Sequence, residues 1–266
     1  MCTSFVLYSD KTYIGMNLDI SERPIALSLK GRDQFLVLQK EGPSFYPAFG
    51  LNRSGAFMNL LMVESNEAGK YRRGKDCVHI MRIFEGVLGG LIGPDALETL
   101  LREKTVVNVP SISVHSMVTG KDRYACIIEP GRTNIHLNSS RSFLVLTNFP
   151  LSDFAESDYC AVEGAGADRH KTCYRMLLES QGAFRIDRGL AILEATAQVT
   201  GDWPTQFSML AVPEDECLYF TLKRNYQKRY RFSFVDHVVQ TDQGFARQQG
   251  HILDKKGTLL SELEQW

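Results

Sequence analysis

The sequence predicts an α+β protein whose strands and helices pack in separate layers. Short runs rich in β-branched and aromatic residues recur between turns that contain glycine, proline, asparagine or aspartate, which is typical of strands. Two pairs of segments with the apolar spacing of helices interrupt these runs. Because strand runs that alternate with helix pairs favour layered packing, we expect one α+β domain over residues 1–266.

The first strands are expected to form a hairpin. Residues 2–8 and 12–18 have extended patterns, and the turn Ser9-Asp10-Lys11 separates them. Cys2 and the residues from Asn17 to Asp19 then face each other across the hairpin. Further strands, each ended by a turn, are expected at 24–30, 34–39, 46–51 and 55–63.

The first helix pair follows a polar loop at 64–74. Apolar residues recur at helical spacing over 75–88, and Pro94 and Asp95 begin a second helix that ends near Lys104. A run of strands is expected next, at 105–109, 111–118, 123–129, 133–137 and 143–147.

The second helix pair is expected at 168–179 and 187–199, where apolar residues again lie on one face. The remaining expected strands lie at 206–212, 217–222 and 231–234. After them we expect a polar tail that ends in a short helix from Leu259.

Charge and hydropathy narrow the classes of function. The formal net charge is -1 and the pI is about 6.6, which argues against a nucleic-acid or anionic-membrane partner. The basic stretch over 223–231 is therefore interpreted as a solvated strand pair. Apolar runs are too short to span a bilayer, and the first ten residues lack the basic region of a secretion signal, so we expect a cytoplasmic protein.

The cysteines and histidines do not have the spacing of metal ligands. Six cysteines occur, without a C-x-x-C pair or histidines at zinc spacing, at positions 2, 77, 126, 160, 173 and 217. In a cytoplasmic chain we expect these thiols to be free. Neither a metal nor a cofactor is expected.

Cys2 has the position that chemistry would choose. If Met1 is removed, Cys2 carries a thiol and a free α-amine, and the ordinary pKa values of both groups lie near neutrality, at about 8.5 and about 7.7–8.0. The amine can then act as the base for its own thiol, whose thiolate is the nucleophile. The alternative is that Cys2 simply begins a strand as a small apolar residue.

Two polar segments are candidates to assist Cys2. In Gly15-Met16-Asn17-Leu18-Asp19, strand alternation places Asn17 and Asp19 on one side, where a carboxylate can orient the terminal amine. Asn148 follows an apolar strand and can donate an amide hydrogen bond to an oxyanion. The alternatives are a solvent-facing Asn17 and Asp19, and a simple turn at Asn148 before Pro150.

Four short segments together carry a family resemblance: Cys2-Thr3, Gly15-x-Asn17-x-Asp19, Gly50-Leu51-Asn52 before Gly55, and Leu146-Thr147-Asn148 before Pro150. In this order and spacing, the chain resembles the choloylglycine hydrolase and penicillin V acylase family of linear amide C–N hydrolases, which are N-terminal-nucleophile hydrolases. The resemblance implies a four-layer αββα sandwich and the hydrolysis of a linear amide through an acyl-cysteine, without a cofactor. The expected partner is a small N-acyl amide substrate.

The resemblance also implies roles for individual residues. Cys2 corresponds to the nucleophile, Asp19 to the group that binds its amine, and Asn148 to an oxyanion donor. The arginine that opens the following helix corresponds to Arg169, with Arg175 as the alternative. The second oxyanion donor corresponds to Asn59 by residue type, or to the backbone N–H of Met62 by register; Asn17 and Met16 are expected beside the substrate.

Two departures from the family pattern affect these expectations. Met16 stands where the family has an arginine, and the loss of a nearby cation predicts a higher thiol pKa. The stretch between Asn148 and Arg169 is shorter than in bile-salt hydrolases, where a long insertion helps to build tetramers. We therefore expect a different assembly, which leaves homo-oligomerisation open, and a substrate other than bile salts.

Three functions remain open from the sequence. The first is hydrolysis of an N-acyl amide by Cys2. The second is a non-catalytic binding protein on the same scaffold, because Met16 replaces the arginine. The third is an acyltransferase that passes the acyl group to an amine instead of water.

Overall fold

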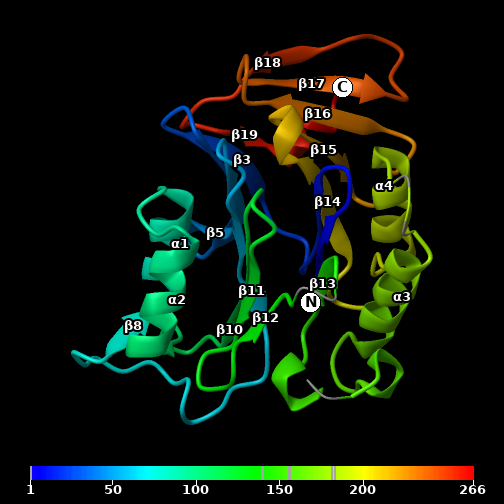
Figure 1. Ribbon diagram of the computed structural model, residues 1–266. Coiled ribbons are helices and arrows are strands. Elements are labelled where there is room, and N and C mark those ends of the chain that lie inside the picture. Colours follow the sequence, from blue (N-terminus) through cyan, green and yellow to red (C-terminus); the bar gives the residue numbers. More distant parts are fainter. Residues whose placement is uncertain (1, 139–140, 155–156, 181, 183) are drawn as a thin grey trace.

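Two large antiparallel sheets lie face to face, and a helix pair covers the outer face of each (Figure 1). The computed structural model describes residues 2–138, 141–154, 157–180, 182 and 184–266. The order of the layers is α1 and α2, one sheet, the other sheet, and then α3 and α4. The expected four-layer αββα sandwich is confirmed.

The first sheet, sheet A, has eight strands and begins with the predicted hairpin. Cys2 pairs with Leu18 across this hairpin, which confirms it. In spatial order the strands are β13 (Phe143–Leu146), β1 (Cys2–Tyr8), β2 (Thr12–Asp19), β14 (Thr205–Val212), β15 (Cys217–Leu222), β16 (Arg229–Ser233), β17 (Val238–Gln243) and β18 (Gly250–Ile252).

The second sheet, sheet B, has nine strands. Eight follow in the order β12 (Ile135–His136), β11 (Ala125–Ile128), β10 (Val114–Thr119), β6 (Phe57–Asn59), β5 (Ser44–Asn52), β4 (Gln34–Glu41), β3 (Ile25–Lys30) and β19 (Thr258–Leu259). The short strand β7 (Leu61–Met62) also pairs with β10. β8 (Cys77–His79) and β9 (Thr105–Val107) form a separate parallel pair.

The helices lie on the outer faces of the sheets. α1 (Ile80–Leu88) packs on β5 and β6, and α2 (Pro94–Glu103) follows it. α3 (Ala167–Leu178) packs on β1 and β13, and α4 (Ile186–Ala195) packs on β2 and β14. A short helix, α5 (Leu260–Leu263), ends the chain near β3.

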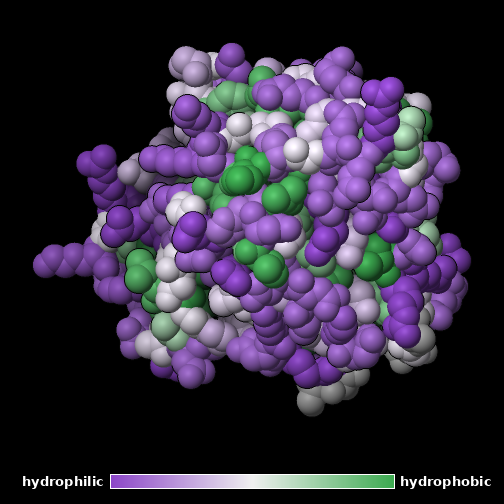
Figure 2. Space-filling view, turned by 90° about the horizontal axis from the view of Figure 1, so that it is seen from above, coloured by the Kyte–Doolittle hydropathy of each residue, from purple (hydrophilic) through white to green (hydrophobic). Residues whose placement is uncertain are grey.

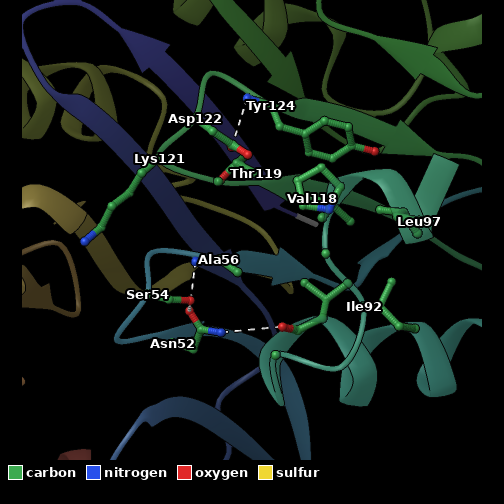
Figure 3. A pocket seen from close by; sticks show the side chains of 15 residues that line it. Asn52, Ser54, Ala56, Ile92, Leu97, Val118, Thr119, Lys121, Asp122 and Tyr124 are labelled. Atoms are coloured by element: carbon green, nitrogen blue, oxygen red, sulfur yellow. Dashed lines mark hydrogen bonds between the residues drawn. The ribbon is translucent and has the colours of Figure 1, made fainter.

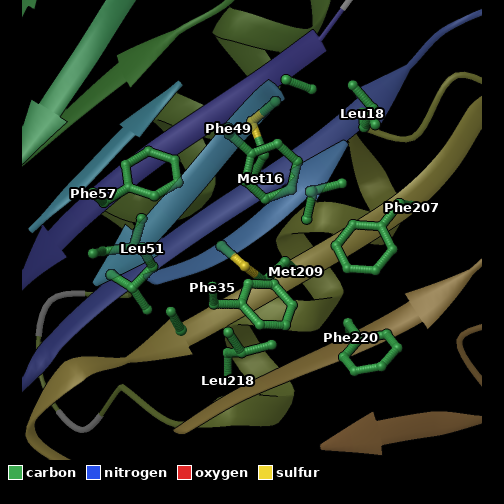
Figure 4. Packing of buried hydrophobic residues seen from close by; sticks show 14 of the residues in the cluster. Met16, Leu18, Phe35, Phe49, Leu51, Phe57, Phe207, Met209, Leu218 and Phe220 are labelled. Carbon is green, nitrogen blue, oxygen red and sulfur yellow. The ribbon is translucent and has the colours of Figure 1, made fainter. Parts of the chain in front are cut away.

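The main core fills the space between the sheets (Figure 4). Phe49 of sheet B and Phe207 of sheet A lie with ring centroids 6.0 Å apart, and so link the two layers directly. Alternate residues of β1 enter different cores: Val6 packs between the sheets and Phe5 packs under α3 and α4. Because both faces of β1 are buried, its sequence reads as a nearly continuous apolar run.

Two sequence predictions need correction. The helix predicted over 75–88 begins only at Ile80, because Cys77–His79 pairs in parallel with β9 instead. The predicted polar tail contains three strands, β17, β18 and β19, besides the expected terminal helix. Buried and more exposed residues alternate along most of β17, so its polar residues are compatible with a strand that is covered on one face.

The surface seen from above is mainly hydrophilic, and its apolar side chains form small separate groups (Figure 2). Among the described helices, none has both the length and the apolar character needed to cross a bilayer. The basic stretch at 223–231 forms the β15–β16 turn and part of β16. Its cations make ion pairs, as Lys223 does with Glu264 and Arg229 with Asp187.

Candidate active site

Cys2 begins β1, the strand next to the edge strand β13 of sheet A, and it is only 5% exposed. Its partner across the hairpin is Leu18, so both side chains point into the core between the sheets. The thiol therefore lies at one end of the sandwich, between the two layers.

Asn148 is brought to Cys2 by the pairing of β13 with β1. Ser4 pairs with Leu146, so the residues after β13 reach the beginning of β1. The backbone N–H of Cys2 donates to Oδ1 of Asn148 at 2.5 Å. Asn148 Nδ2 in turn donates to the carbonyl oxygen of Met62 at 2.7 Å. The amide of Asn148 thus connects the first strand of sheet A to sheet B.

Arg169 organises the backbone around Cys2. Its Nη1 donates to the carbonyl oxygen of Cys2 at 2.6 Å and to Thr3 Oγ1 at 2.9 Å, and Nη2 donates to Asn148 Oδ1 at 3.1 Å. The guanidinium can reach them because Gly166, with φ +79°, caps the helix there and has no side chain: a Cβ at Gly166 would lie 2.4 Å from Nη2.

Asp19 is the acidic member of this group and is completely buried. Its Oδ2 accepts a hydrogen bond from Arg169 Nη1 at 3.1 Å, and its Oδ1 accepts one from the hydroxyl of Thr205 at 2.5 Å. Burial raises the pKa of Asp19 to about 6, although the positive charge of Arg169 and the hydrogen bond from Thr205 oppose this shift. The carboxyl is therefore mainly ionised at neutral pH.

The thiol of Cys2 is held in its neutral form. Burial raises its pKa to about 11, and the negative charge of Asp19 adds to the shift. The positive charge of the N-terminus, the backbone N–H of Asp19 and the guanidinium of Arg169 lower the pKa of the thiol but do not outweigh burial. A nearby group that removes the thiol proton is thus needed for nucleophilic chemistry at neutral pH.

The backbone of Met62 faces the site. Val63 N–H donates to Ser113 O in the ladder between β7 and β10. Since antiparallel pairs alternate, the Met62–Val114 pair is a non-hydrogen-bonded one, and the N–H and C=O of Met62 point away from β10. The contact between Met62 O and Asn148 fits this direction. The Met62 N–H and the second hydrogen of Asn148 Nδ2 are therefore two donors at one edge.

Three candidate residues are placed differently from what the sequence suggested. Asn17 pairs with Thr3, and its Nδ2 donates to Leu193 O of α4 at 2.8 Å, so alternation turns its side chain away from Cys2. Met16 is on the same face as Cys2 but is fully buried in the core. Asn59 is also fully buried, and its Oδ1 accepts from the backbone N–H of Met117. Neither Asn17 nor Met16 therefore exposes a side chain that could make the substrate contact suggested by the sequence.

Arg175 lies away from Cys2, whereas two threonines without a predicted role lie beside the site. Arg175 lies on the surface of α3 in an ion pair with Glu179, so Arg169 is the arginine that reaches Cys2. Thr3 and Thr205 were missed by the sequence analysis. Thr3 carries a local signal, its place beside Cys2, whereas Thr205 is recognisable only once β14 is known to pair with β2.

Two cavities lie away from Cys2, which lines neither of them. The larger, of about 340 Å³, lies between the α1–α2 connection and the β10–β11 turn (Figure 3). That is the opposite end of β1, where the Tyr8 hydroxyl donates to Gly120 O at 3.0 Å. The smaller, of about 230 Å³, follows the outer edge of β13 and includes His170. Cys2 is itself only 5% exposed, so its side chain is largely covered in this conformation.

Comparison with known structures identifies the fold. A mutant of conjugated bile acid hydrolase from Clostridium perfringens superimposes with a TM-score of 0.69 at 14% identity, over 96% of this chain and 98% of that one. Penicillin V acylase from Agrobacterium tumefaciens gives a TM-score of 0.65 at 14% identity, over 95% and 94%. The chain has the N-terminal-nucleophile hydrolase fold. The resemblance inferred from four short segments is thus confirmed at the level of the fold.

At the level of sequence the comparisons give nothing further. No protein-family model matches the chain, and no curated protein matches its sequence. The relationship to the two hydrolases is therefore carried by the arrangement of the layers, which both solved structures share over nearly their whole length.

Proposed function

We propose that the protein is an amidase that hydrolyses the linear amide bond of a small N-acyl substrate with Cys2 as its nucleophile. The observation that supports this most directly is the convergence on Cys2 of Asn148, Arg169 and Asp19 from three separate elements. The proposal includes the removal of Met1, a residue that lies outside the described ones. Removal converts the nitrogen that donates to Asn148 into a free α-amine.

The proposed reaction uses the groups already described. The α-amine of processed Cys2 takes the thiol proton, and Sγ attacks the amide carbonyl carbon. Asn148 Nδ2 and the Met62 N–H donate to the oxyanion. The amine then gives the proton to the leaving nitrogen as the C–N bond breaks. Water attacks the acyl-cysteine by the same route and releases the acid.

Arg169 and Asp19 are proposed to position the nucleophile. Arg169 holds the Cys2 carbonyl, and Asp19 holds Arg169 and bears a negative charge close to the amine. This negative charge stabilises the ammonium form that the α-amine adopts after it takes the thiol proton. The mechanism requires neither a metal nor a cofactor.

The test combines three forms of the chain. Intact mass first establishes whether one methionine has been lost. Wild type, Cys2→Ala and a form with one alanine inserted before Cys2 are then assayed on penicillin V, a conjugated bile acid and straight-chain N-acyl amides. Both altered forms should lose at least about 10³-fold in turnover, since one lacks the thiol and the other lacks a free Cys2 amine. Undiminished turnover in Cys2→Ala would sink the proposal.

One observation favours a second candidate, a non-catalytic binding protein. Met16 replaces the arginine expected beside Cys2, and the thiol pKa is raised by burial to about 11. A thiol-directed acylating probe separates the two candidates. An active Cys2 takes up the probe before the other five cysteines, whereas a binding protein is labelled first at the exposed Cys160.

The acyl acceptor is a separate question. Hydrolysis and transfer share the acyl-cysteine, and they differ only in whether water or an amine attacks it. Product analysis with an added primary amine distinguishes them: a hydrolase continues to release the free acid, whereas a transferase forms the new amide. We propose hydrolysis in the cytoplasm as the main activity.

A further inference from the structure

A buried pair of a histidine and a glutamate lies behind the loop that carries Asn148. His115 of β10 and Glu129, which directly follows β11, are 0% and 2% exposed, and His115 Nδ1 lies 3.0 Å from Glu129 Oε1. Neither residue has a role in the reaction proposed above. Because a buried charge is costly unless hydrogen bonds satisfy it, the contacts of this pair are informative.

The other hydrogen bonds described for these two side chains go to the loop that carries Asn148. On one side of Asn148, His115 Nε2 lies 2.7 Å from Thr147 O. On the other side, Glu129 Oε1 accepts from Leu151 N–H at 2.8 Å and Oε2 accepts from Ser152 N–H at 2.9 Å. The pair thus holds both ends of a six-residue loop, from 147 to 152, with Asn148 between them.

The partners of these two side chains fix the direction of the hydrogen bonds. Thr147 O can only accept, so Nε2 of His115 carries a proton. Although burial alone raises the pKa of Glu129, the hydrogen bonds from His115 and Ser152 outweigh it and hold that pKa below its ordinary value. An ionised Glu129 can only accept, so it accepts from His115 and from both loop N–H groups.

Strand β10 also positions Met62, the residue that accepts the hydrogen bond from Asn148 Nδ2. His115 pairs with Leu61, the residue before Met62, and Asn148 Nδ2 donates to Met62 O. His115 is therefore linked to both proposed oxyanion donors: its strand partner Leu61 directly precedes Met62, and its Nε2 contacts Thr147, which directly precedes Asn148. On the outer side, Arg132 joins Asp153 to Glu64 and so reinforces the same loop.

We propose that His115 and Glu129 are positioning residues that fix the Asn148 amide relative to Cys2 and Met62. This role rests on the proposed function, since the precise placement of an oxyanion donor is useful only to an acyl-transfer site. The pair does not contact the substrate. It replaces the mobility expected of a surface loop with a fixed geometry.

The test separates placement of the oxyanion donors from reactivity of the thiol. Acylation by p-nitrophenyl acetate passes through a tetrahedral oxyanion, whereas alkylation by iodoacetamide does not. In Glu129→Gln one amide oxygen replaces two carboxylate oxygens, so the side chain cannot accept from both loop N–H groups, and the negative charge beside His115 is lost. We expect acylation of Cys2 to slow by about 10- to 100-fold, with alkylation of Cys2 within about 2-fold of wild type.

Hydrogen exchange gives a readout that does not depend on activity. The amides of Leu151 and Ser152 should exchange at least about 10-fold faster in Glu129→Gln, because they lose their buried acceptors. The matched control is Glu98→Gln, which alters a His–Glu pair of equal length, 3.0 Å, whose side chains are 42–43% exposed. That variant should leave exchange at 147–152 and acylation unchanged.

A second variant covers the possibility that Glu129→Gln does not fold. In the double variant His115→Gln, Glu129→Gln the imidazole and the carboxylate are removed together, so neither is left buried without its partner. It should fold and still show faster exchange at 151–152 together with the selective loss of acylation. Exchange and acylation that match wild type in either folded variant, or acylation and alkylation that fall equally, would overturn the positioning role. A wild type that p-nitrophenyl acetate cannot acylate counts against the proposed function alone, and hydrogen exchange then decides the positioning role.

Discussion

The backbone nitrogen of Cys2 lies 2.5 Å from Oδ1 of Asn148, although 146 positions separate the two residues. The contact exists because β13 runs beside β1 as the edge strand of sheet A. Arg169 Nη2 donates to the same oxygen and so fixes the amide orientation, with Nδ2 towards Met62. The side chain of Asn148 therefore joins Cys2, Met62 and the guanidinium of Arg169.

Arg169→Met should lower both stability and activity. The substitution leaves Asp19 as a buried charge without its cation, which costs about 3–5 kcal/mol in the free energy of unfolding. The Cys2 carbonyl and Asn148 also lose their donor, so turnover should fall by roughly 100-fold. Chemical denaturation and steady-state kinetics measure the two effects.

Arg175→Met is the matched control for that substitution. Arg175 lies on the same helix, but its ion pair with Glu179 is exposed, with side chains 58% and 52% accessible. Its loss should change stability by less than about 0.5 kcal/mol and leave turnover unchanged. Equal effects of the two substitutions would show that Arg169 has no special part in the site.

Gly166→Ala should displace the guanidinium of Arg169. Gly166 has φ +79°, and a Cβ there would meet Arg169 Nη2 at 2.4 Å and Thr147 Cβ at 3.2 Å. Strain in the left-handed region costs about 1–2 kcal/mol, and the displaced guanidinium should reduce turnover by roughly 10-fold or more. Gly201→Ala isolates the strain, because Gly201 has φ +87° and open space around it. A similar loss of stability without a loss of turnover is expected there.

Alkylation of Cys2 should depend on pH differently in the blocked and the processed chain. The pKa of about 11 means that thiolate is scarce at pH 7 when an extra alanine precedes Cys2, so its rate with iodoacetamide should rise about tenfold per pH unit up to pH 10. In the processed chain the α-amine lies beside the thiol, and its positive charge lowers the thiol pKa. The midpoint should therefore move to lower pH. Cys160→Ser in both forms removes the exposed thiol from the measurement. Identical profiles would exclude activation by the amine.

Local patterns were sufficient for most of the elements. The β1–β2 hairpin, α2, α3 and α4 lie within a few residues of their predicted ranges, because apolar spacing and turn residues are local properties. The pattern was insufficient at Cys77–His79, where pairing with β9 replaces the first turn of the expected helix. It was also insufficient at β17 to β19, where polar residues lie on the open faces of paired strands.

The sequence by itself determined the identity of the nucleophile candidate and the layered α+β class, since both depend on chain position and on short-range periodicity. It also marked Asn148, Asp19 and Arg169 as candidates. Only the tertiary structure decided how these residues meet: Arg169 rather than Arg175 reaches Cys2, Asn17 turns towards α4, and Met62 faces Asn148. Strand register and helix docking set these contacts, and both depend on partners between 86 and 176 positions away along the chain. The contacts of His115 and Glu129 with the loop at 147–152 were likewise visible only in the tertiary structure.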